Sequence, residues 1–498
     1  MDRKKLIVVT FLVLVSALFI YIRIKPLHFQ TVAYTYDQGR DFLKTAEMVT
    51  TKKPTFIGPT TGINGLYHGA WWYYVLAIPF ILFKGSPIGF YYFNLAVQFG
   101  AFFVLFYFVK KYFGSLSAGI VSLLVALSPY FTYVSVFVGN NTMVPPVLLG
   151  FLILNFMLLE NKKINRPFVF ALGLGLLLGL VAEFELSFGL FLIPSYFIAQ
   201  FLFKKLRTFY GSLHNLGFFL LGLGIAFTPR FLFELKNKFI QTTTLFSFIF
   251  KPKLFNPKSY AETFRDRLEL FRWFYEGLFL HSFFSVVFCI LIALFLIYLL
   301  VKRTGLYTRA LLFLLYLVGM LFFLSTLYKD FFWGNYFEGI QYILILLISI
   351  IFSTKVSRRH LERYGKCFVI SLLLFFGLWH VVFSWKSTPK YEGLAVHRAV
   401  VSYIISHEKK TNNYCVRIYT PPVLAHTYNY VFLYEKLKRN IALPGFEWVD
   451  GTCWFIIEPD PFRYRLKDWK KINEPKKKAT ITSKRIHDVL INHYEVIQ

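Results

Sequence analysis

The residues best placed to do chemistry follow the first apolar segment, in the run Thr35-Tyr36-Asp37-Gln38-Gly39-Arg40-Asp41. Asp37 and Asp41 are four residues apart, so they share one face if this run continues as a helix. A solvated helix at the membrane surface would explain the acids equally well, because Asp37 could cap its free amides. Carboxylates at the end of a membrane helix indicate a catalytic role when other polar residues lie on the same side of the membrane.

Other polar residues fall on that side once the spans are placed. His68 stands in Gly65-Leu66-Tyr67-His68-Gly69, where glycines allow backbone to approach a ligand, although a bonded loop histidine is the simpler interpretation. Glu183 and Glu185 lie next to an apolar span, where burying a charged group costs free energy. This cost indicates a function, unless the two side chains are exposed at the surface. Arg230 ends a span and could hold a phosphate or mark the interface. The remaining candidates are Arg40, Asn141, Lys329 and Tyr336.

The composition predicts a polytopic membrane protein of the all-α class. Hydrophobic residues make up 56% of 498, and the mean hydropathy is +0.53, more than a soluble globular chain carries. A bilayer core about 30 Å thick takes roughly 20 apolar residues per helix, which predicts about eleven spans. They are expected near residues 6–24, 88–109, 116–134, 144–159, 168–182, 187–203, 211–229, 279–301, 309–327, 339–354 and 367–385.

Short basic clusters near the span ends predict the orientation, because lysine and arginine stay cytoplasmic there. The N-terminus and all five later clusters lie inside only if Trp71 to Phe83 does not cross. Thirteen residues make about 20 Å of helix, which is too short, so we expect an interfacial or re-entrant helix with Trp71, Trp72, Tyr73 and Tyr74 at headgroup level. The first outer loop is then long, from about residue 25 to 87, and a further outer loop covers 230–278.

The tail has a different character, so residues 1–385 are predicted to form a transmembrane domain and 386–498 a small α/β domain on the outer face. The tail loses the apolar runs and contains strand-like strings at 415–419 and 454–457. Cys415 and Cys453 share this domain and could pair in an oxidising compartment. Cys289 and Cys367 lie in predicted spans and are expected to be inert.

The net charge of +29 has two sources. Much of it lies in cytoplasmic clusters, and the excess on the outer parts could attract anionic headgroups or a lipid phosphate. Nucleic-acid binding is disfavoured, because the aromatic residues lie mostly in apolar spans and no basic reading module is present.

Several of these motifs together resemble glycosyltransferase family 39, which has the C-type multi-spanning fold. They are Tyr36-Asp37-Gln38-Gly39-Arg40-Asp41, Ile57-Gly58-Pro59-Thr60-Thr61, Gly65-Leu66-Tyr67-His68-Gly69, Lys110-Lys111-Tyr112-Phe113-Gly114, Phe233-Glu234-Leu235 after Pro229, and Asn335-Tyr336. The resemblance covers about residues 1–385 and is strongest over 30–115. The family includes protein O-mannosyltransferases and lipid A aminoarabinose transferases.

The resemblance implies a transferase in the plasma membrane that moves a sugar from a polyprenyl phosphate to a hydroxyl of a protein, lipid or glycan outside the cell. The position matching the family's catalytic base is Asp37. One carboxylate that takes the acceptor proton suffices for an inverting displacement. The cations Arg40, Arg230 and Lys329 could contact the phosphate, and Glu183 and Glu185 the acceptor.

This sequence departs from the family pattern at two places. Gln38 stands where a glutamate is frequent, and Gly139-Asn140-Asn141-Thr142 replaces an acid or a Trp-Asn-Pro motif. A carboxylate pair that bridges a divalent metal is therefore disfavoured, and no cofactor is expected to be obligatory.

Three other classes remain open. A lipid flippase or transporter would also be polytopic, but it usually has inverted repeats and charged helices at mid-membrane. A polymerase or ligase of pyrophosphate-linked glycans would be expected to place arginine or histidine in a large later loop. A scaffold without activity would explain Gln38 and the missing second acid.

Overall fold

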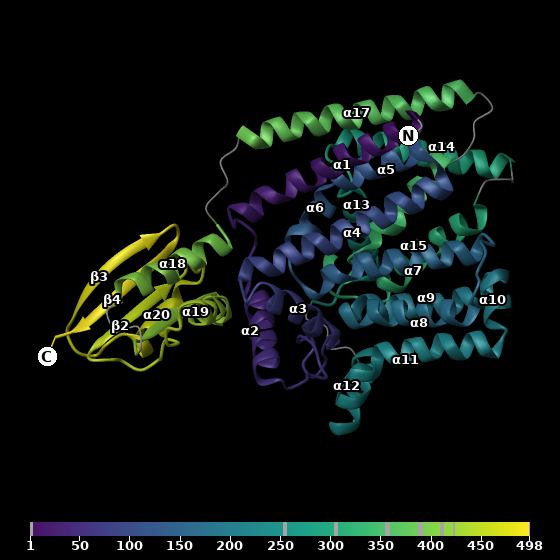
Figure 1. Cartoon of the computed structure of the whole chain (residues 1–498). Helices are drawn as coiled ribbons and strands as arrows, with labels where there is room; N and C mark the ends of the chain where they lie inside the picture. Colours follow the sequence, from purple (N-terminus) through teal and green to yellow (C-terminus); the bar gives the residue numbers. More distant parts are fainter. Residues whose placement is uncertain are drawn as a thin grey trace.

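The computed structural model describes residues 3–251, 256–302, 307–353, 359–386, 392–408, 413–421 and 424–497. Helices run side by side through most of the chain, and a small sheet domain sits at one end of the bundle (Figure 1). The helices up to Lys386 are α1 (Arg3–His28), α2 (Tyr36–Thr51), α3 (Trp71–Leu82), α4 (Pro87–Phe113), α5 (Ser115–Leu127), α6 (Pro129–Val136), α7 (Val144–Leu159), α8 (Pro167–Phe184), α9 (Leu186–Leu202), α10 (Lys204–Tyr210), α11 (Leu213–Lys236), α12 (Ile240–Phe250), α13 (Tyr260–Glu276), α14 (Ser282–Lys302), α15 (Thr308–Thr326), α16 (Ile340–Ser353) and α17 (Arg359–Lys386).

The chain is a multi-pass membrane protein, with fewer spans among the described helices than the eleven expected. Among the described helices, seven spans are long and apolar enough to cross a bilayer, namely α1, α4, α8, α11, α15, α17 and the run Asn140–Leu159, in which a short 3-10 turn leads into α7. Two bent pairs, α5 with α6 and α9 with α10, raise the number to nine. The difference arises from length, because α16 has 14 residues and is about 21 Å long, below the 30 Å of a bilayer core.

The break between α5 and α6 has a clear physical cause. Pro129 has no N–H to donate to the carbonyl oxygen of Val125, and the two helices bend by 59° there. The buried guanidinium of Arg23 replaces the missing donor, bonding the carbonyls of Val125 (3.1 Å) and Ala126 (2.9 Å). Arg23 also donates to Ser135 Oγ (3.1 Å), so a charge inside the bundle is fully engaged in holding a broken span.

The segment between α1 and α4 contains the two short helices that matter for the site. α3 has only 12 residues, as expected for a helix that does not cross. α2 lies at the end of the bundle where the sheet domain begins (Figure 1). The sequence analysis predicted an outer loop over residues 230–278. In the structure α11 continues past Pro229 to Lys236, and the helices α12 and α13 follow.

The C-terminal part contains the predicted small α/β domain. Its elements are α18 (Leu394–His407), β1 (Val416–Tyr419), α19 (His426–Arg439), β2 (Thr452–Ile457), α20 (Arg463–Asn473), β3 (Ala479–Ile486) and β4 (Val489–Val496). The strands are ordered β1-β2-β4-β3, with β1 parallel to β2 and the other pairs antiparallel. Alternate residues of β2 pack on opposite faces, Trp454 and Ile456 with the main core and Phe455 against Trp469 of α20. Cys415 and Cys453, whose pairing the sequence left open, form a disulfide.

The N-terminus and the sheet domain lie at opposite ends of the bundle (Figure 1). α18 begins against the end of α1, where Leu394 N donates to Val32 O (3.1 Å) and Arg398 Nη1 to Gln30 Oε1 (2.6 Å). The 26 residues of α1 span about 39 Å, more than the thickness of a bilayer core. The two termini are therefore separated by the full length of the first span.

Candidate active site

The first part of the site is built by the start of α2. Gln38 fixes this end of the helix, since its Oε1 accepts from Thr35 N (2.8 Å) and its Nε2 donates to Val138 O (2.9 Å). Gln38 therefore links α2 to the loop before Asn140. This is the position at which glycosyltransferase family 39 often has a glutamate. The bonding of Gln38 gives the neighbouring acids a fixed position.

Asp37 and Asp41 share the same arginine but differ in exposure. Arg40 Nη1 lies 2.7 Å from Asp37 Oδ1, and Arg40 Nε lies 2.9 Å from Asp41 Oδ1. The Asp37 side chain is 50% exposed and the Asp41 side chain 4%. Of the two aspartates, only Asp37 is therefore accessible to a substrate. The buried Asp41 holds Arg40 in place.

Sequence reasoning missed the residue that holds Asp41. Trp72, which was expected at headgroup level, is buried inside the protein, and its Nε1 donates to Asp41 Oδ2 (2.8 Å). Burial raises the pKa of Asp41 to about 6, against the opposite effect of Arg40 and Trp72. The tryptophan-rich start of α3 was a signal for this contact, because a buried indole N–H needs an acceptor.

The second part of the site is a buried ion pair. Arg230 of α11 donates through Nε to Glu183 Oε1 of α8 at 2.6 Å. Its Nη1 bonds Tyr67 O (2.9 Å) and Gln241 Oε1 (2.8 Å). Three buried polar atoms remain without a hydrogen-bond partner here, namely Arg230 Nη2, Glu183 Oε2 and Gln241 Nε2. Such a cluster of unsatisfied atoms is expected where a polar ligand or water belongs.

The segment 58–69 connects the two parts. Arg40 Nη1 reaches Thr60 Oγ1 (3.3 Å), and Gly69 N donates to Glu183 O (2.6 Å). Gly69 must be glycine, because a Cβ atom would lie 2.1 Å from Glu183 Oε2. His68 is half-buried between the clusters, and burial together with Arg230 and Arg40 lowers its pKa to about 3. Neutral His68 Nδ1 accepts from Leu186 N (3.4 Å).

Asn141, Glu185 and Tyr336 form a third group around Glu338. Asn141 Nδ2 donates to Glu338 Oε2 (3.0 Å), and Glu185 Oε1 accepts from Ser187 N (3.3 Å). Burial raises the pKa of Glu338 to about 7 and that of Glu185 to about 8. Burial and the nearby Glu185 raise the pKa of Tyr336 to about 12. Glu338 was not among the predicted residues, although an acid directly before an apolar run was a usable signal.

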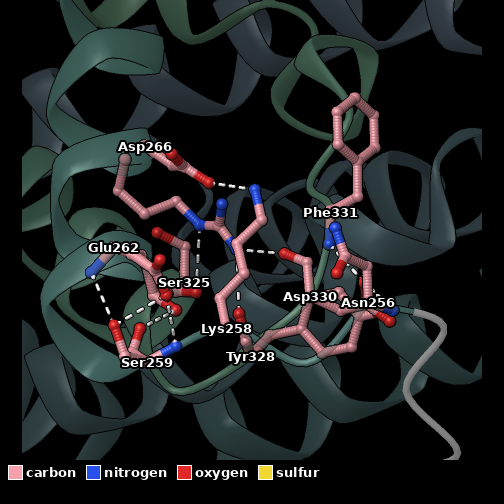
Figure 2. A network of polar contacts seen from close by, with 11 residues as sticks. Asn256, Lys258, Ser259, Glu262, Asp266, Ser325, Tyr328, Asp330 and Phe331 are labelled. Carbon is pink, nitrogen blue, oxygen red and sulfur yellow. Dashed lines mark hydrogen bonds and ion pairs between the residues drawn. The ribbon is translucent and has the colours of Figure 1, made fainter.

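Lys329 lies between Tyr328 and Asp330, two residues of the separate polar network shown in Figure 2. Its side chain is exposed, and its carbonyl oxygen accepts from Lys258 N (3.0 Å). Next to it, Lys258 pairs with Asp266, and Asp330 Oδ1 accepts from Asn256 N (3.2 Å). Among the described contacts, none joins the Lys329 ammonium group to the Asp37 or Arg230 clusters. This network fixes the segment that leads to Tyr336.

Comparison with solved structures identifies the architecture. The chain matches the crystal structure of ArnT from Cupriavidus metallidurans bound to undecaprenyl phosphate with a TM-score of 0.62 and 11% identity, over 98% of this chain and 97% of that chain. The chain has the ArnT fold. The apo state of ArnT gives a TM-score of 0.60 with the same identity and coverage.

The sequence alone shows much less of this similarity. No protein-family model matches it, and no curated protein is significantly similar. ArnT is a lipid A aminoarabinose transferase, one of the classes that the sequence resemblance named. At 11% identity the likeness concerns the fold, so the roles of Asp37 and Arg230 are argued from their own surroundings.

Proposed function

We propose that this protein is a membrane glycosyltransferase that moves a sugar from a polyprenyl phosphate to a hydroxyl acceptor on the extracytoplasmic face. The observation that carries the proposal is the presence of a half-exposed carboxylate, Asp37, and of a partly buried arginine, Arg230, whose Nη2 atom has no hydrogen-bond partner. Segment 58–69 joins them, since Arg40 beside Asp37 reaches Thr60 Oγ1 and Arg230 bonds Tyr67 O. The undecaprenyl phosphate in the ArnT crystal structure supports the donor class.

In the proposed reaction Asp37 acts as the general base. It takes the proton of the acceptor hydroxyl while the oxygen attacks the anomeric carbon from the face opposite the phosphate. The new glycosidic bond forms as the bond to the phosphate oxygen breaks, so the configuration inverts. Arg40 orients the Asp37 carboxylate through a contact of 2.7 Å, and buried Asp41 holds Arg40 in turn.

Arg230 is the proposed phosphate contact. Its Nη2 atom has no hydrogen-bond partner in the protein and can donate a charge-assisted hydrogen bond to a phosphate oxygen. The bonds of Nε to Glu183 and of Nη1 to Gln241 fix the direction of this donor. With this charge in place the mechanism requires no divalent metal, and independence from metal stays a prediction.

The finer predictions belong to this proposal. The site and the sheet domain face outward and the N-terminus faces the cytoplasm, as the basic clusters predict. The division at residues 385 and 386 stays a prediction that falls at the end of α17. Asn141, Glu183, Glu185, His68 and Tyr336 remain candidate contacts for the sugar or the acceptor.

The function is tested with a panel of radiolabelled polyprenyl-phosphate sugars added to membranes that contain the protein. We expect one donor to label an acceptor, with the glycosidic bond inverted relative to the donor. Retained configuration would contradict the single-base mechanism. Label transferred only from pyrophosphate-linked oligosaccharides would contradict the donor class.

A further inference from the structure

The charge of the C-terminal domain is gathered in one segment. Residues 463–485 hold ten lysine and arginine residues and two acids, a net charge of +8. The other residues from 392 to 498 hold seven and nine, a net charge of −2. Nine of the ten cations are exposed, Lys470 being half-buried. The positive charge therefore lies on the surface of α20, of β3 and of the turn between them.

The two acids of this segment are already paired with its own cations. Glu474 Oε1 lies 3.3 Å from Lys470 Nζ and accepts from Tyr494 Oη (2.9 Å). Asp468 Oδ1 lies 3.5 Å from Lys471 Nζ. None of the described ion pairs involves the other eight cations, which repel one another. They are Arg463, Arg465, Lys467, Lys476, Lys477, Lys478, Lys484 and Arg485.

α20 packs on the face of the sheet that is turned away from α18. The ring of Trp469 lies 5.4 Å from that of Tyr419 of β1 and 5.6 Å from that of Phe455 of β2. Trp454 of β2 points to the opposite face, where its ring lies 6.1 Å from that of Tyr403 of α18. Since α18 bonds the end of α1, the face with α20 is not the one that contacts the membrane domain.

One flank of α20 faces the rest of this sheet face. The bond of Glu474 to Tyr494 places this flank over β4. Arg463, Lys467 and Lys470 share the flank, because residues three and four apart lie on one side of a helix.

β3 brings a further cation to the same face. Arg485 stands opposite Leu490 in the strand register, and Leu490 packs in the cluster of Phe455 and Tyr494 beneath α20. Directly paired strand residues point to the same side of a sheet, so Arg485 shares the face with Lys467. Cations from a helix and from an edge strand therefore meet on one surface.

The extent of this surface indicates the size of its partner. The 11 residues of α20 span about 16 Å, and Lys476, Lys477 and Lys478 continue the charge to the start of β3. One small anion could contact only a few of these cations. A linear polymer with an anionic group in each unit can contact many of them, and it gains free energy from released counterions.

We propose that α20 and β3 form a docking surface for a linear phosphodiester polymer of the cell envelope. Arginine on both elements suits phosphate, since a guanidinium group can bond two of its oxygens at once. The disulfide in the same domain indicates an oxidising compartment, which makes an envelope polymer the partner rather than a nucleic acid. This docking does not depend on the proposed transferase activity.

The test measures the binding of dye-labelled poly(glycerol phosphate) to the full-length protein in nanodiscs of neutral lipid. The double variant Lys467→Gln with Arg485→Gln removes one cation from α20 and one from β3. The matched control is Lys436→Gln with Lys438→Gln, on α19. All four side chains are exposed and have no described ion pair, so both double variants are expected to fold.

Wild type and the control should bind the polymer equally well. The variant of α20 and β3 should bind about ten-fold less tightly at low salt, about three-fold for each lost contact. Its plot of log affinity against log salt concentration should be shallower than that of wild type by about 1.4, or about 0.7 for each contact. These losses would support the docking surface whether or not the protein transfers a sugar.

Three results would overturn the proposal. The first is equal affinity of the two double variants for the polymer. The second is tighter binding of polyglutamate with the same number of charges, which would show that phosphate is not recognised. The third is binding of phosphatidylglycerol vesicles in preference to the polymer, which would assign the surface to a membrane.

Discussion

The two aspartates of α2 lie one turn apart, yet their surroundings give them different tasks. Asp37 is half exposed and bonds one arginine, whereas Asp41 is buried beneath Arg40 and Trp72. A general base such as Asp37 must be accessible to its substrate. A carboxylate that holds an arginine in place, as Asp41 does, is best shielded from water. At this scale the fold, and not the residue type, decides which carboxylate can act.

Arg230 and Glu183 allow structure and binding to be separated. Arg230→Met should lower the free energy of unfolding by about 3–5 kcal/mol, because it leaves Glu183 buried without its partner. The double variant Arg230→Met with Glu183→Gln should recover most of that loss but still fail to bind undecaprenyl phosphate. Thermal unfolding and lipid binding in detergent measure the two effects. Normal lipid binding by the double variant would contradict the phosphate role.

His68 predicts a dependence of stability on acid. Its pKa of about 3 in the folded protein lies below the ordinary value near 6.5, so the unfolded chain binds more protons between these values. The contribution of His68 to stability should therefore fall as the pH drops from 6.5 toward 3. His68→Gln keeps an acceptor for Leu186 N and should make the fall of the Tm with pH less steep. Parallel curves for the two proteins would contradict this account.

The sequence identified most of these side chains but not their partners. Asp37, Arg40 and Asp41 are adjacent in the chain, so their pairing followed from helical spacing. Trp72 and Glu338 were missed because their contacts are made between segments far apart in sequence. The cost of burying a charge pointed to Glu183, but only the fold could show that Arg230 is its partner.

The contact between α2 and α19 is the element that joins the two domains. Gly39→Ala should destabilise it by about 1–3 kcal/mol, since the new methyl group would lie 2.5 Å from the His426 backbone. Limited proteolysis should then release the C-terminal domain more quickly than in wild type. Gly62→Ala is the control, because nothing lies within 4 Å of a Cβ atom there. Equal cleavage of both variants would show that close packing at Gly39 is unimportant.

The length of the apolar runs predicted the long helices well and the helices α12 and α13 poorly. The runs that became α4, α7, α8 and α15 are continuous and need no partner to be recognised. α12 and α13 lie in a segment expected to be a loop, although the capping box of Ser259 and Glu262 marks the start of α13. The short α16 falls below the length of a span, whereas the bent pair α5–α6 forms the one span that was predicted over 116–134.

The molecule as a whole separates its N-terminus from its sheet domain by the length of the bundle (Figure 1). The disulfide between Cys415 and Cys453 agrees with an oxidising compartment for the sheet domain. The small α/β domain was predicted from the sequence, which left this pairing open. Its docking against α2 was not, because no local pattern encodes a contact between such distant segments.

Removal of the disulfide tests the location and stability of that domain. The cysteines are 38 residues apart, so Cys415→Ser with Cys453→Ser should cost about 4 kcal/mol of stability in the chain-entropy account. In intact cells a membrane-impermeant maleimide should label the two cysteines only after reduction. Labelling without reduction would contradict the pairing, and no labelling of intact cells after reduction would contradict the outward orientation.

The central claim is that Asp37 is the base, and single-turnover transfer with a preloaded polyprenyl-phosphate sugar tests it most directly. Asp37→Asn should lower the rate by at least about 100-fold, because the amide cannot take the acceptor proton. Donor binding should stay unchanged. The control is Asp488→Asn, the same change at an exposed position between β3 and β4. A near-normal rate in Asp37→Asn would contradict the account.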